Sequence, residues 1–485
     1  MGKNKQLTPR SEDFSAWYNE LVFRAELADH SPVRGSMVIR PWGYAIWENM
    51  QRSLDDMFKE TGHQNIYLPL LIPMSFIEKE KDHVEGFKPE LVVVTHAGGK
   101  ELEESLVVRP TSETMVMSMM GKWVQSYRDL PMKLNQWVNV MRWELRTRIF
   151  LRTSEFLWQE GHTMHATSGE AEEHTKSMLN VYRRFMEEWM AMPPVTGLKS
   201  DSEKFAGALR SYSCEAMMQD NKALQAGTSH FLGQNFSRQF EVTFQTQEGK
   251  EEYGWNTSWG VSTRLLGGLI MTHGDDQGLV LPPKLAPTQV VVVPVRDTDD
   301  GSVLEKANAI NSELQDRGIR SQVDNRNFLN PGSKFYEWER KGVPIRLEIG
   351  PRDMEVNQVV VAERIVSKNQ DRKYILPESE ALQTMTGRLS GLQKLLLEQA
   401  VNRRESNSYR GVSELGELQE IMDRSGGFVY TGWSGDPTVE QKIKELTGAT
   451  LRCLPNQEFR SSDCPTMCIG GEKKSETEVV WAKAY

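Results

Sequence analysis

The chain has 485 residues, which is too long for one compact core and suits two or three domains. Its hydrophobic fraction of 38% excludes a disordered chain. Its formal net charge of −9 excludes a uniformly basic nucleic-acid binder, while leaving room for a local basic patch.

The N-terminal segment MGKNKQLTPRSEDFSAWYNE lacks the apolar core of a signal peptide. No apolar run in the sequence reaches membrane-spanning length. The four Cys are too few for a disulfide scaffold and favour a reducing compartment. We therefore expect a soluble cytoplasmic protein with no membrane partner.

The segment VVRPTSETMVMSMMGKW (107–123) is predicted to run from a strand through Pro110 into a helix. Thr111 or Ser112 is expected at the helix N-cap, and Glu113 in the first turn. Ordinary helix capping explains the Thr and the Ser. It explains less well why RPTSE occurs in a chain that also carries the charged strand described next.

The segment KLNQWVNVMRWELRTRIFLRTSEFLWQEGH (133–162) is predicted to form an antiparallel hairpin with an Arg-rich loop. Because alternate side chains share a face, Arg142 and Glu144 on the first strand should face Trp158, Glu160 and His162 on the second. One interpretation is a self-satisfied polar network within a sheet. The other is a pocket for a small zwitterion, with the Arg for a carboxylate or phosphate, Glu160 for an amine and the Trp as an apolar wall.

Two further segments precede a domain boundary. Residues 166–222 are predicted to begin with a helix capped by Thr167 and Glu170 in a capping box. The segment WNTSWGVSTRLLGGLIMTHGDDQGLVLPP (255–283) begins with small residues around Trp259 and continues as a helix that carries Arg264. The three prolines of LPPKLAPTQ (281–289) then indicate the boundary.

The second half of the chain alternates strands and helices. VVVVPV (290–295) is typical of a strand buried on both faces, and SVLEKANAINSELQDRG (302–318) of an amphipathic helix. The pattern predicts an α/β domain with a mostly parallel sheet. A long helix (378–404) then leads into a final module of about 80 residues that contains three of the four Cys.

Together these segments resemble a class II aminoacyl-tRNA synthetase, and closely a prolyl-tRNA synthetase. Residues 34–73 resemble the family's motif 1, a long helix followed by a strand with Pro69. RWELRTRIFLRTSEFLWQE resembles motif 2 and GVSTRLLG motif 3, while RPTSE, FLWQEGHT, ALQAGTSH, NTSWG and HGDDQGLVLPP match this particular synthetase. PGSKFYEWERKGVPIRLEIGPRD (331–353) resembles its anticodon-binding domain.

The resemblance implies a fold of three parts. An α+β catalytic domain on an antiparallel class II sheet is expected at 1–283, an α/β anticodon-binding domain at 284–385, and a small α/β C-terminal module at 386–485. The short segment 166–222 leaves no room for the editing domain that part of the family inserts there. The chain therefore resembles the archaeal and eukaryotic branch, which carries a C-terminal extension.

The implied reaction attaches L-proline to tRNA(Pro) in two steps through prolyl-adenylate and releases AMP and pyrophosphate, with ATP bound together with Mg²⁺ as substrate. The resemblance also implies a homodimer joined through motif 1. The first step needs positioning and charge neutralisation more than a protein nucleophile. The expected catalytic residues are Arg142, Arg152 and Arg264. The proline site is expected to comprise Phe87, Thr111, Glu113, Arg142, Trp158, Glu160, His162, Ser258, Trp259 and Gly260. The ATP site is expected to comprise Arg142, Glu144, Arg152, Phe156, Gln225, Thr228 and Arg264.

Outside the catalytic domain, Glu339, Arg346 and Arg352 fall where the family reads two guanines of the anticodon. For Glu339 the alternative is a solvated helix face. The final module retains Cys453, Cys464 and Cys468 but no other Cys and no His, so we expect no zinc there. By resemblance, the terminal Tyr485 can reach back toward the active site; the alternative is a frayed end.

Shape alone must select a ring of methylenes, so some activation of alanine or cysteine is expected. Three other functions remain open. A related enzyme for another amino acid would differ at Thr111, Glu113 or Trp158. An inactive tRNA-binding paralogue would lack one of the three arginines. A metalloenzyme would need a closed set of His ligands, which the sequence does not show.

Overall fold

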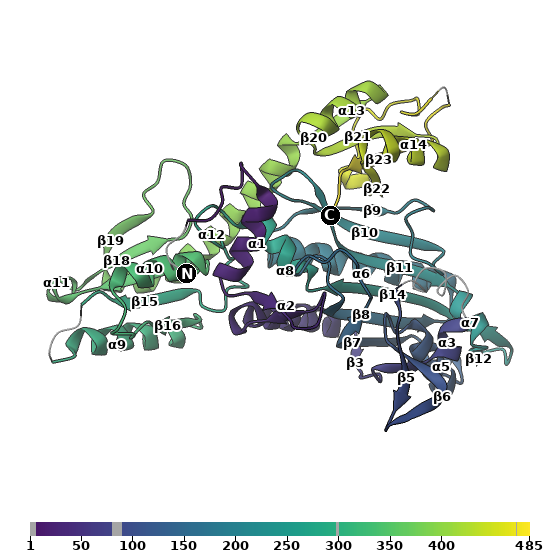
Figure 1. Cartoon of the computed structure of the whole chain (residues 1–485), viewed down its shortest axis with the longest axis horizontal. Helices are drawn as coiled ribbons and strands as arrows, with labels where there is room; N and C mark the ends of the chain where they lie inside the picture. The colour runs from purple at the N-terminus through teal and green to yellow at the C-terminus, as the bar shows by residue number, and fades with distance from the viewer. Residues whose placement is uncertain (1–5, 80–89, 297–299, 472) are drawn as a thin grey trace.

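The computed structural model describes residues 6–79, 90–296, 300–471 and 473–485. It has the three parts that the sequence predicts: a large, mainly antiparallel sheet with helices, a smaller α/β domain and a C-terminal module (Figure 1). The smaller domain lies at one end of the molecule, and helix α12 (Glu378–Ser406) connects it to the other two parts. The predicted boundary at 385/386 falls within this continuous helix.

The large sheet has 11 strands and includes strands of the C-terminal module. In spatial order they are β20 (Ser408–Val412), β21 (Phe428–Trp433), β23 (Thr477–Ala482), β22 (Thr450–Pro455), β9 (Pro194–Leu198), β10 (Arg210–Met217), β11 (Ala223–Gly233), β14 (Trp255–Ser262), β8 (Glu155–His165), β7 (Met132–Met141) and β3 (Gln64–Asn65). β22 pairs antiparallel with β9, where Leu454 lies opposite Leu198. The module therefore extends the catalytic sheet, which its separate position in the sequence did not predict.

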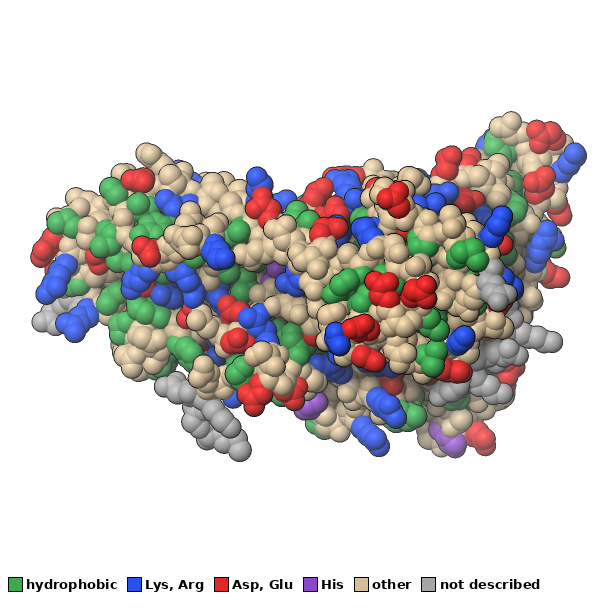
Figure 2. Space-filling model, turned by 90° about the horizontal axis from the view of Figure 1, so that it is seen from above, with side chains coloured by type: hydrophobic (Ala, Val, Ile, Leu, Met, Phe, Trp, Pro, Cys, Tyr) green, Lys and Arg blue, Asp and Glu red, His purple; other side chains and the backbone are tan. Residues whose placement is uncertain are grey.

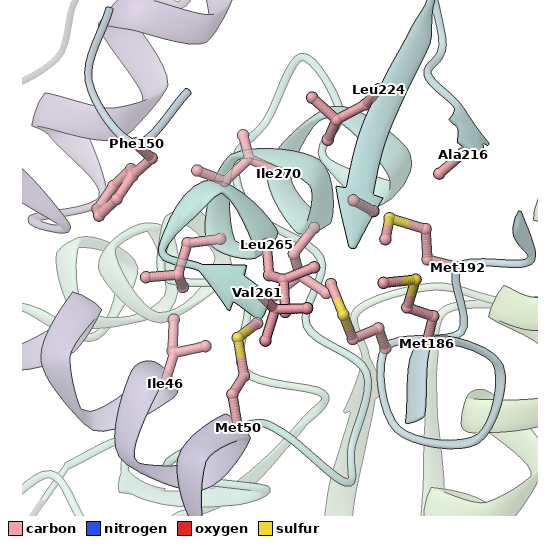
Figure 3. Close-up of a cluster of buried hydrophobic side chains, with 14 of the residues drawn as sticks. Ile46, Met50, Phe150, Met186, Met192, Ala216, Leu224, Val261, Leu265 and Ile270 are labelled. Atoms are coloured by element: carbon pink, nitrogen blue, oxygen red, sulfur yellow. The ribbon is translucent and has the colours of Figure 1, made fainter. Parts of the chain in front are cut away.

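Helices cover one face of this sheet and form the main core with it. They are α1 (Phe14–Arg24), α2 (Pro41–Glu60), α6 (Ser168–Glu188) and α8 (Arg264–His273). Figure 3 shows part of this core, with Ile46 and Met50 from α2 facing Val261 and Leu265. The predicted capping box of α6 is confirmed, because Thr167 and Glu170 each bond the other's backbone N–H. We refer to the helix-covered side as the back face and to the opposite side as the front face.

Strand pairing decides which side chains reach each face. Directly opposed residues of antiparallel strands share a face, and neighbours along a strand alternate. Glu160 and His162 of β8 therefore lie on the front face, opposite Gly260 and Ser258 of β14. Trp259 lies opposite Gly161, and its indole packs on the back face in the main core. His165 also lies on the back face, against His174 of α6.

Smaller elements of the catalytic domain lie outside this sheet. They are β1 (Ala28–His30), β2 (Met37–Ile39), β4 (Leu71–Pro73), α3 (Met74–Glu78), β5 (Val92–Ala97), β6 (Lys100–Val108), α5 (Glu113–Trp123), α7 (Asn235–Gln239), β12 (Thr243–Gln245) and β13 (Glu251–Tyr253). The prediction of a strand containing Pro69 is wrong. Pro69 lies in the irregular segment between β3 and β4, because proline has no N–H to donate to a ladder.

The smaller domain contains a five-stranded sheet in the order β16-β15-β17-β18-β19. Its elements are β15 (Val290–Pro294), α9 (Ser302–Asp316), β16 (Ser321–Val323), α10 (Pro331–Arg340), β17 (Ile345–Ile349), α11 (Pro351–Glu355), β18 (Gln358–Glu363) and β19 (Lys373–Pro377). β15 is buried throughout, as predicted. The prediction of a mostly parallel sheet is wrong: β18 and β19 return as antiparallel strands through connections too short for a crossover helix.

The C-terminal module adds α13 (Leu415–Arg424) and α14 (Pro437–Thr447) to its four strands. Within the described part of the chain, no helix combines the length and the apolar character needed to cross a membrane.

Candidate active site

The predicted hairpin is present, but its first strand is shorter than expected. β7 and β8 pair antiparallel from Met132 to Met141, so Arg142 and Glu144 lie just beyond the strand rather than on it. The chain leaves the ladder because Met141 N–H bonds the carbonyl of Arg109 and Trp143 N–H bonds that of Glu90. The Arg142 guanidinium nevertheless returns to the hairpin face, 5.4 Å from the ring centre of Trp158.

The RPTSE loop is attached to β8 by a buried hydrogen-bond network. Ser112 donates to Glu160 from its backbone N–H (3.1 Å) and from its hydroxyl, and Gln136 donates to the same carboxylate. Ser112 occupies the N-cap position of α5 but makes no side-chain capping bond, so the interpretation of Thr111 and Ser112 as ordinary caps is wrong. Their hydroxyls bond Glu113 and Glu160 instead.

Glu160 therefore orients the loop, and Thr111 and Glu113 are presented as a bonded pair at the pocket wall. Arg142 contributes from the other side by donating its Nε–H to the Pro110 carbonyl (3.1 Å). The positioning roles of Ser112 and Gln136 were not predicted. For Gln136 the hairpin register was the available signal, since Gln136 lies opposite Glu160.

His162 completes this network at the end of the row. Its Nε2 lies 3.2 Å from Glu160 Oε2. Burial alone would lower the pKa of His162, but the hydrogen bond and the charge of Glu160 outweigh burial and raise that pKa. The imidazolium form is thereby favoured beside the carboxylate.

One pocket gathers most of the predicted site residues on the front face. Its lining includes Thr111, Glu113, Arg142, Phe156, Trp158, Glu160, His162, Gln225, Thr228, Ser258, Trp259, Gly260 and Arg264. Two buried polar atoms in it, Trp158 Nε1 and Ser258 Oγ, have no hydrogen-bond partner among the described residues. Buried polar groups are normally satisfied, so these atoms indicate a place for a polar ligand.

Two predicted members of the proline wall require comment. The indole of Trp259 packs on the back face against His63 and His174, so strand alternation leaves mainly its backbone facing the pocket. Phe87 lies outside the described residues.

The nucleotide side of the pocket is a cationic lobe. Arg264 begins α8 and donates to the carbonyls of Leu151 (3.1 Å) and Gln225 (3.4 Å). Burial and the nearby charges of Arg142 and Arg152 lower the pKa of Arg264 to about 10, so it remains charged at neutral pH. Three like charges held together favour a polyanionic ligand between them.

Arg152 and Glu144 lie at the mouth of this lobe. Arg152 Nε is 2.6 Å from Glu144 Oε2, and the Arg152 side chain is 62% exposed. Phe156 lies below, with Arg142 5.7 Å from its ring centre. Arg152 and Phe156 line the same lobe, so an exposed arginine and an aromatic ring are both available there to a nucleotide base.

The pocket extends beyond the predicted residues toward β10. This extension is lined by Lys199, Glu203, Phe205, Ser211 and His230. The rings of Phe205 and His230 stack at 4.6 Å, and His230 Nδ1 lies 2.8 Å from Ser211 Oγ. The sequence singled out ALQAGTSH, which ends in His230, but gave that histidine no role.

In the smaller domain, Glu339 and Arg346 line one cavity together with Trp338, Arg372 and Lys373. Glu339 accepts a 2.6 Å bond from Arg372, and Arg346 bonds Glu348 (2.9 Å). Arg352 lies on α11 and is not among the residues lining this cavity. Figure 2 shows Lys and Arg side chains close together on this domain, a local basic surface on an acidic chain.

The three candidate cysteines do not converge on one site. Cys453 is buried in one hydrophobic cluster with Phe428 and Tyr430, Cys468 is buried in another, and Cys464 is exposed. Within the described ranges no group of three or more His, Cys, Asp or Glu could hold a metal ion. These residues do not fit a structural zinc site.

The chain ends against the catalytic domain. Tyr485 N–H bonds the Ala223 carbonyl (3.1 Å) and its hydroxyl donates to Asp220 (2.6 Å). Arg148, in the hairpin loop, lies over its ring at 5.3 Å and over Tyr18 at 4.9 Å. The end is docked, so the frayed alternative is wrong.

Comparisons with known proteins agree with this geometry. The family described as the tRNA synthetase class II core domain (G, H, P, S and T) matches residues 91–273, and the anticodon binding domain family matches 289–387. The fold and pocket are thus those of a class II aminoacyl-tRNA synthetase. The family of prolyl-tRNA synthetase C-terminal domains matches 415–485.

Full-length relatives give the particular family. The chain is 54% identical to a proline--tRNA ligase of Chlorobium phaeobacteroides (strain BS1) over 483 residues, 99% of each protein. It is 52% identical to that of Prosthecochloris aestuarii over 99% of this chain and 100% of the relative. A crystal structure of prolyl-tRNA synthetase from Cryptosporidium parvum, complexed with halofuginone and AMPPNP, superposes with a TM-score of 0.92 at 37% identity over 99% of both chains. The chain belongs to the prolyl-tRNA synthetase family, in its archaeal and eukaryotic type.

Proposed function

We propose that this chain, a proline--tRNA ligase by family, activates L-proline with ATP in the front-face pocket and transfers the prolyl group to tRNA(Pro). The observation that carries the proposal is the hydrogen-bonded Ser112–Glu160–His162 network, which presents Thr111 and Glu113 opposite Arg142. A carboxylate with its bonded hydroxyl on one side and a guanidinium on the other match an amino acid, which has an amine at one end and a carboxylate at the other.

In this arrangement Thr111 and Glu113 bind the imino group of proline, and Arg142 binds its carboxylate. Trp158 forms the apolar wall for the ring, with Phe87 assigned to the same wall. The backbone of Trp259 and Gly260, with Ser258, closes the far side. Each methylene contributes only about 1–3 kcal/mol of discrimination, so smaller amino acids such as alanine and cysteine are activated to a measurable extent.

Activation is an attack of the proline carboxylate on the α-phosphorus of ATP that releases pyrophosphate. Arg142 faces both the carboxylate and the phosphate lobe, so it can bridge the two reactants and hold them in line. Arg264 and Arg152 neutralise the charge that develops on the phosphates. The adenine lies on Phe156, and Gln225 and Thr228 contact the nucleotide from β11.

ATP is bound as its Mg²⁺ complex, in which the ion offsets part of the triphosphate charge. Glu144 is a carboxylate of the lobe and is assigned contact with this ion or with the adenine amine; Ser154 holds its backbone and Arg152 its side chain. We assign no other metal to the reaction.

Transfer brings the tRNA terminus to the same pocket while the anticodon contacts the smaller domain. Glu339 and Arg346 share one cavity there, which supports their assignment to guanine recognition. Arg352, on α11, is assigned to recognition of the same anticodon guanines. We also propose domain boundaries at 283/284 and, within helix α12, at 385/386. We propose a cytoplasmic location for the protein. We further propose a homodimer joined through motif 1, where Tyr44, Tyr67 and Leu70 are exposed.

All three arginines of the nucleotide lobe line the pocket, which disfavours the inactive tRNA-binding paralogue. The proposed function is tested by charging a tRNA(Pro) transcript with labelled proline, beside a transcript whose two anticodon guanines are changed to adenines. We expect charging of the first and, for the second, a kcat/KM at least tenfold lower. Failure to charge either transcript would refute the proposal, and equal charging would remove the anticodon part of it.

A further inference from the structure

The segment that leads from the catalytic domain to the smaller domain runs beside the end of α10, the helix that carries Glu339. We call residues 275–281, which follow α8, the junction segment. Leu279 N–H bonds the Arg340 carbonyl (2.9 Å), and Leu281 N–H bonds the Gly342 carbonyl (3.2 Å). The junction segment is therefore hydrogen-bonded to the backbone that directly follows Glu339.

Two glycines bring these backbones into close contact. A Cβ built on Gly278 would lie 2.4 Å from the Arg340 Cα, and one built on Gly342 would lie 2.6 Å from the Leu279 Cβ. Real Cβ contacts are longer than 3.0 Å, so neither glycine has room for a side chain. The junction segment thus fits against the end of α10 with little freedom to shift.

Arg372 joins the cavity that holds Glu339 to the junction segment. Its Nη2 donates to Glu339 Oε1 (2.6 Å), and its Nη1 donates to Gln277 Oε1 (2.8 Å). Arg372 lines the cavity, whereas Gln277 is not among the lining residues. Because the guanidinium is a rigid fork, it fixes the Glu339 carboxylate relative to the side chain of Gln277.

Arg364 fixes the backbone of Glu339 in the same way. Its Nε lies within hydrogen-bond distance of the carbonyls of Glu339 (3.1 Å) and Leu279 (2.9 Å). The two Nη atoms donate to the two carboxylate oxygens of Asp275, and the Arg364 side chain is 2% exposed. Both the side chain and the carbonyl of Glu339 are thus held by arginines whose other donors bond the junction segment.

The junction segment is also bonded to the body of the catalytic domain. The Trp17 indole donates to the Asp275 carbonyl (2.9 Å), and Arg10 donates to the Asp276 carboxylate (2.9 and 3.1 Å). The segment follows α8, whose first residue, Arg264, lines the front-face pocket. Bonds to the junction segment are therefore bonds to the part of the enzyme that carries the nucleotide lobe.

A tRNA that contacts both domains is a ligand with two attachment points. Figure 1 shows α10 in the smaller domain at one end of the molecule, and the pocket strands β8 and β14 away from it in the large sheet. For such a ligand, occupation of the second site depends on the geometry fixed between the two sites. A misplacement of reacting groups by about 1 Å can lower a rate by about 100-fold. Contacts that fix Glu339 to the catalytic domain therefore influence the transfer step.

We propose that Arg372 and Arg364 are positioning residues for transfer. They hold Glu339 against the junction segment, so that a tRNA whose guanine is bound at Glu339 presents its terminus to the front-face pocket in one orientation. The proposal rests on the proposed function, because it requires Glu339 to bind an anticodon guanine. It implies that recognition of the anticodon raises the rate of transfer as well as the affinity for tRNA.

The test compares two reactions of the full-length enzyme. Proline-dependent ATP–pyrophosphate exchange reports activation without tRNA, and single-turnover transfer from preformed prolyl-adenylate to a saturating tRNA(Pro) transcript reports transfer. In Arg372→Met we expect exchange within about twofold of wild type and a transfer rate about 3- to 10-fold lower, the change produced by losing one hydrogen bond. Arg317→Met is the matched control and should change neither rate, because Arg317 is 38% exposed in the same domain and pairs with Glu313 at 2.7 Å, whereas Arg372 is 40% exposed.

Gln277→Ala separates positioning from contact with tRNA, because it removes the junction end of the bond and leaves the cavity lining unchanged. We expect the same loss of transfer as in Arg372→Met. The double variant should lose no more than the larger single loss, since both substitutions remove one bond. Gln441→Ala, on an exposed glutamine of α14, is the control.

The anticodon provides a second measurement on the same variants. At saturating tRNA, the wild-type enzyme should transfer more slowly to the transcript with adenines in place of the two guanines, and Gln277→Ala should reduce this difference. An unchanged difference, or an unchanged transfer rate in Gln277→Ala, would overturn the proposal. So would an equal loss of exchange and transfer, which indicates a general structural role. Failure of the wild-type enzyme to charge tRNA, or equal charging of both transcripts, would instead refute the proposed function or its anticodon part.

Arg364 has its own variant, because removing its charge would leave Asp275 without its partner. Arg364→Lys keeps the charge but lacks the fork that bonds both oxygens of Asp275. We expect it to lower the transfer rate at least as much as Arg372→Met does, with exchange retained. Equal loss of exchange and transfer in Arg364→Lys would show that Arg364 only stabilises the fold, and would overturn its positioning role.

Discussion

Gly161 is the position at which the smallest substitution should do the most damage. It lies on β8 between Glu160 and His162 but faces the back of the sheet, where the Trp259 indole crosses it. A Cβ built on Gly161 would lie 2.0, 2.2 and 2.4 Å from three atoms of that ring. Ordinary contact begins at 3.4 Å, so Gly161→Ala requires the ring or the strand to move by about 1.4 Å.

The surroundings leave little room for that movement. The indole is 2% exposed and packs edge-on against His63 and His174, at 4.8 and 5.1 Å between ring centres. Overpacking of a filled core costs about 1–3 kcal/mol, and we expect the upper end of that range. If β8 moves instead, Glu160 and His162 move with it, and a displacement near 1 Å lowers kcat/KM by about 10- to 100-fold.

The assay combines urea unfolding with proline-dependent ATP–pyrophosphate exchange on Gly161→Ala. Gly169→Ala is the matched control, because Gly169 lies on α6 and nothing is within 4 Å of its added Cβ. There the substitution should stabilise by up to about 1 kcal/mol through helix propensity. A Gly161→Ala enzyme with wild-type stability and wild-type KM for proline would refute the placement of Trp259 behind the pocket.

Three further predictions concern charge, pH and the chain end. In steady-state kinetics, Arg264→Met should lower the kcat of ATP–pyrophosphate exchange by about 100-fold or more, because it removes one preorganised charged donor. Arg424→Met, on the surface of the C-terminal module, should leave that kcat unchanged. Burial lowers the pKa of His63 and His165 to about 4, so the unfolded chain takes up protons near pH 6.5 that the folded chain refuses. The contribution of these two neutral histidines to the free energy of unfolding is complete above pH 6.5 and is lost as the pH falls toward 4, by about 2 kcal/mol each at pH 5. Urea unfolding at pH 7 and pH 5 should show this fall in the free energy of unfolding. An equal free energy of unfolding at both pH values would contradict the buried neutral state. Deleting Tyr485 removes one of the two rings that contact Arg148 of the hairpin loop, so it should raise the KM for ATP several-fold and leave the KM for proline unchanged. An unaltered KM for ATP would show that the chain end does not affect the nucleotide lobe.

Sequence periodicity was most informative where one pattern determines both the strand register and the face of the sheet on which each side chain lies. The alternation in FLWQEGH predicts that Trp158, Glu160 and His162 share a face, and the hairpin register bears this out. His165 faces away from them, against His174, because it is an odd number of residues from each of the three. The capping box at Thr167 is a local hydrogen-bond pattern, so it too could be predicted without tertiary contacts.

Other features depend on contacts between distant segments. The end of β7 at Met141 is set by carbonyls of Arg109 and Glu90, which no pattern within the hairpin reveals. Ser112 is the N-cap residue, as predicted, but it makes no side-chain capping bond for the same reason, because its hydroxyl bonds Glu160 across 48 positions of sequence.

Long-range pairing also explains what was missed in the C-terminal module. Its sequence indicates a separate α/β unit, yet β22 joins β9 and places Arg452 against Glu215. No sequence periodicity predicts a buried ion pair between residues 237 positions apart. For the same reason the sequence assigned no role to His230 and Lys199, which the sheet brings to one pocket.

The central claim is that the pocket around Arg142, Trp158 and Glu160 binds proline for activation. The most direct measurement is ATP–pyrophosphate exchange by the wild-type enzyme with proline, alanine and cysteine, each titrated without tRNA. Exchange that saturates at a much lower concentration of proline than of alanine or cysteine, and that Arg142→Met abolishes, is the result we predict. Absence of proline-dependent exchange, or a preference for another amino acid, would contradict the assignment of this pocket.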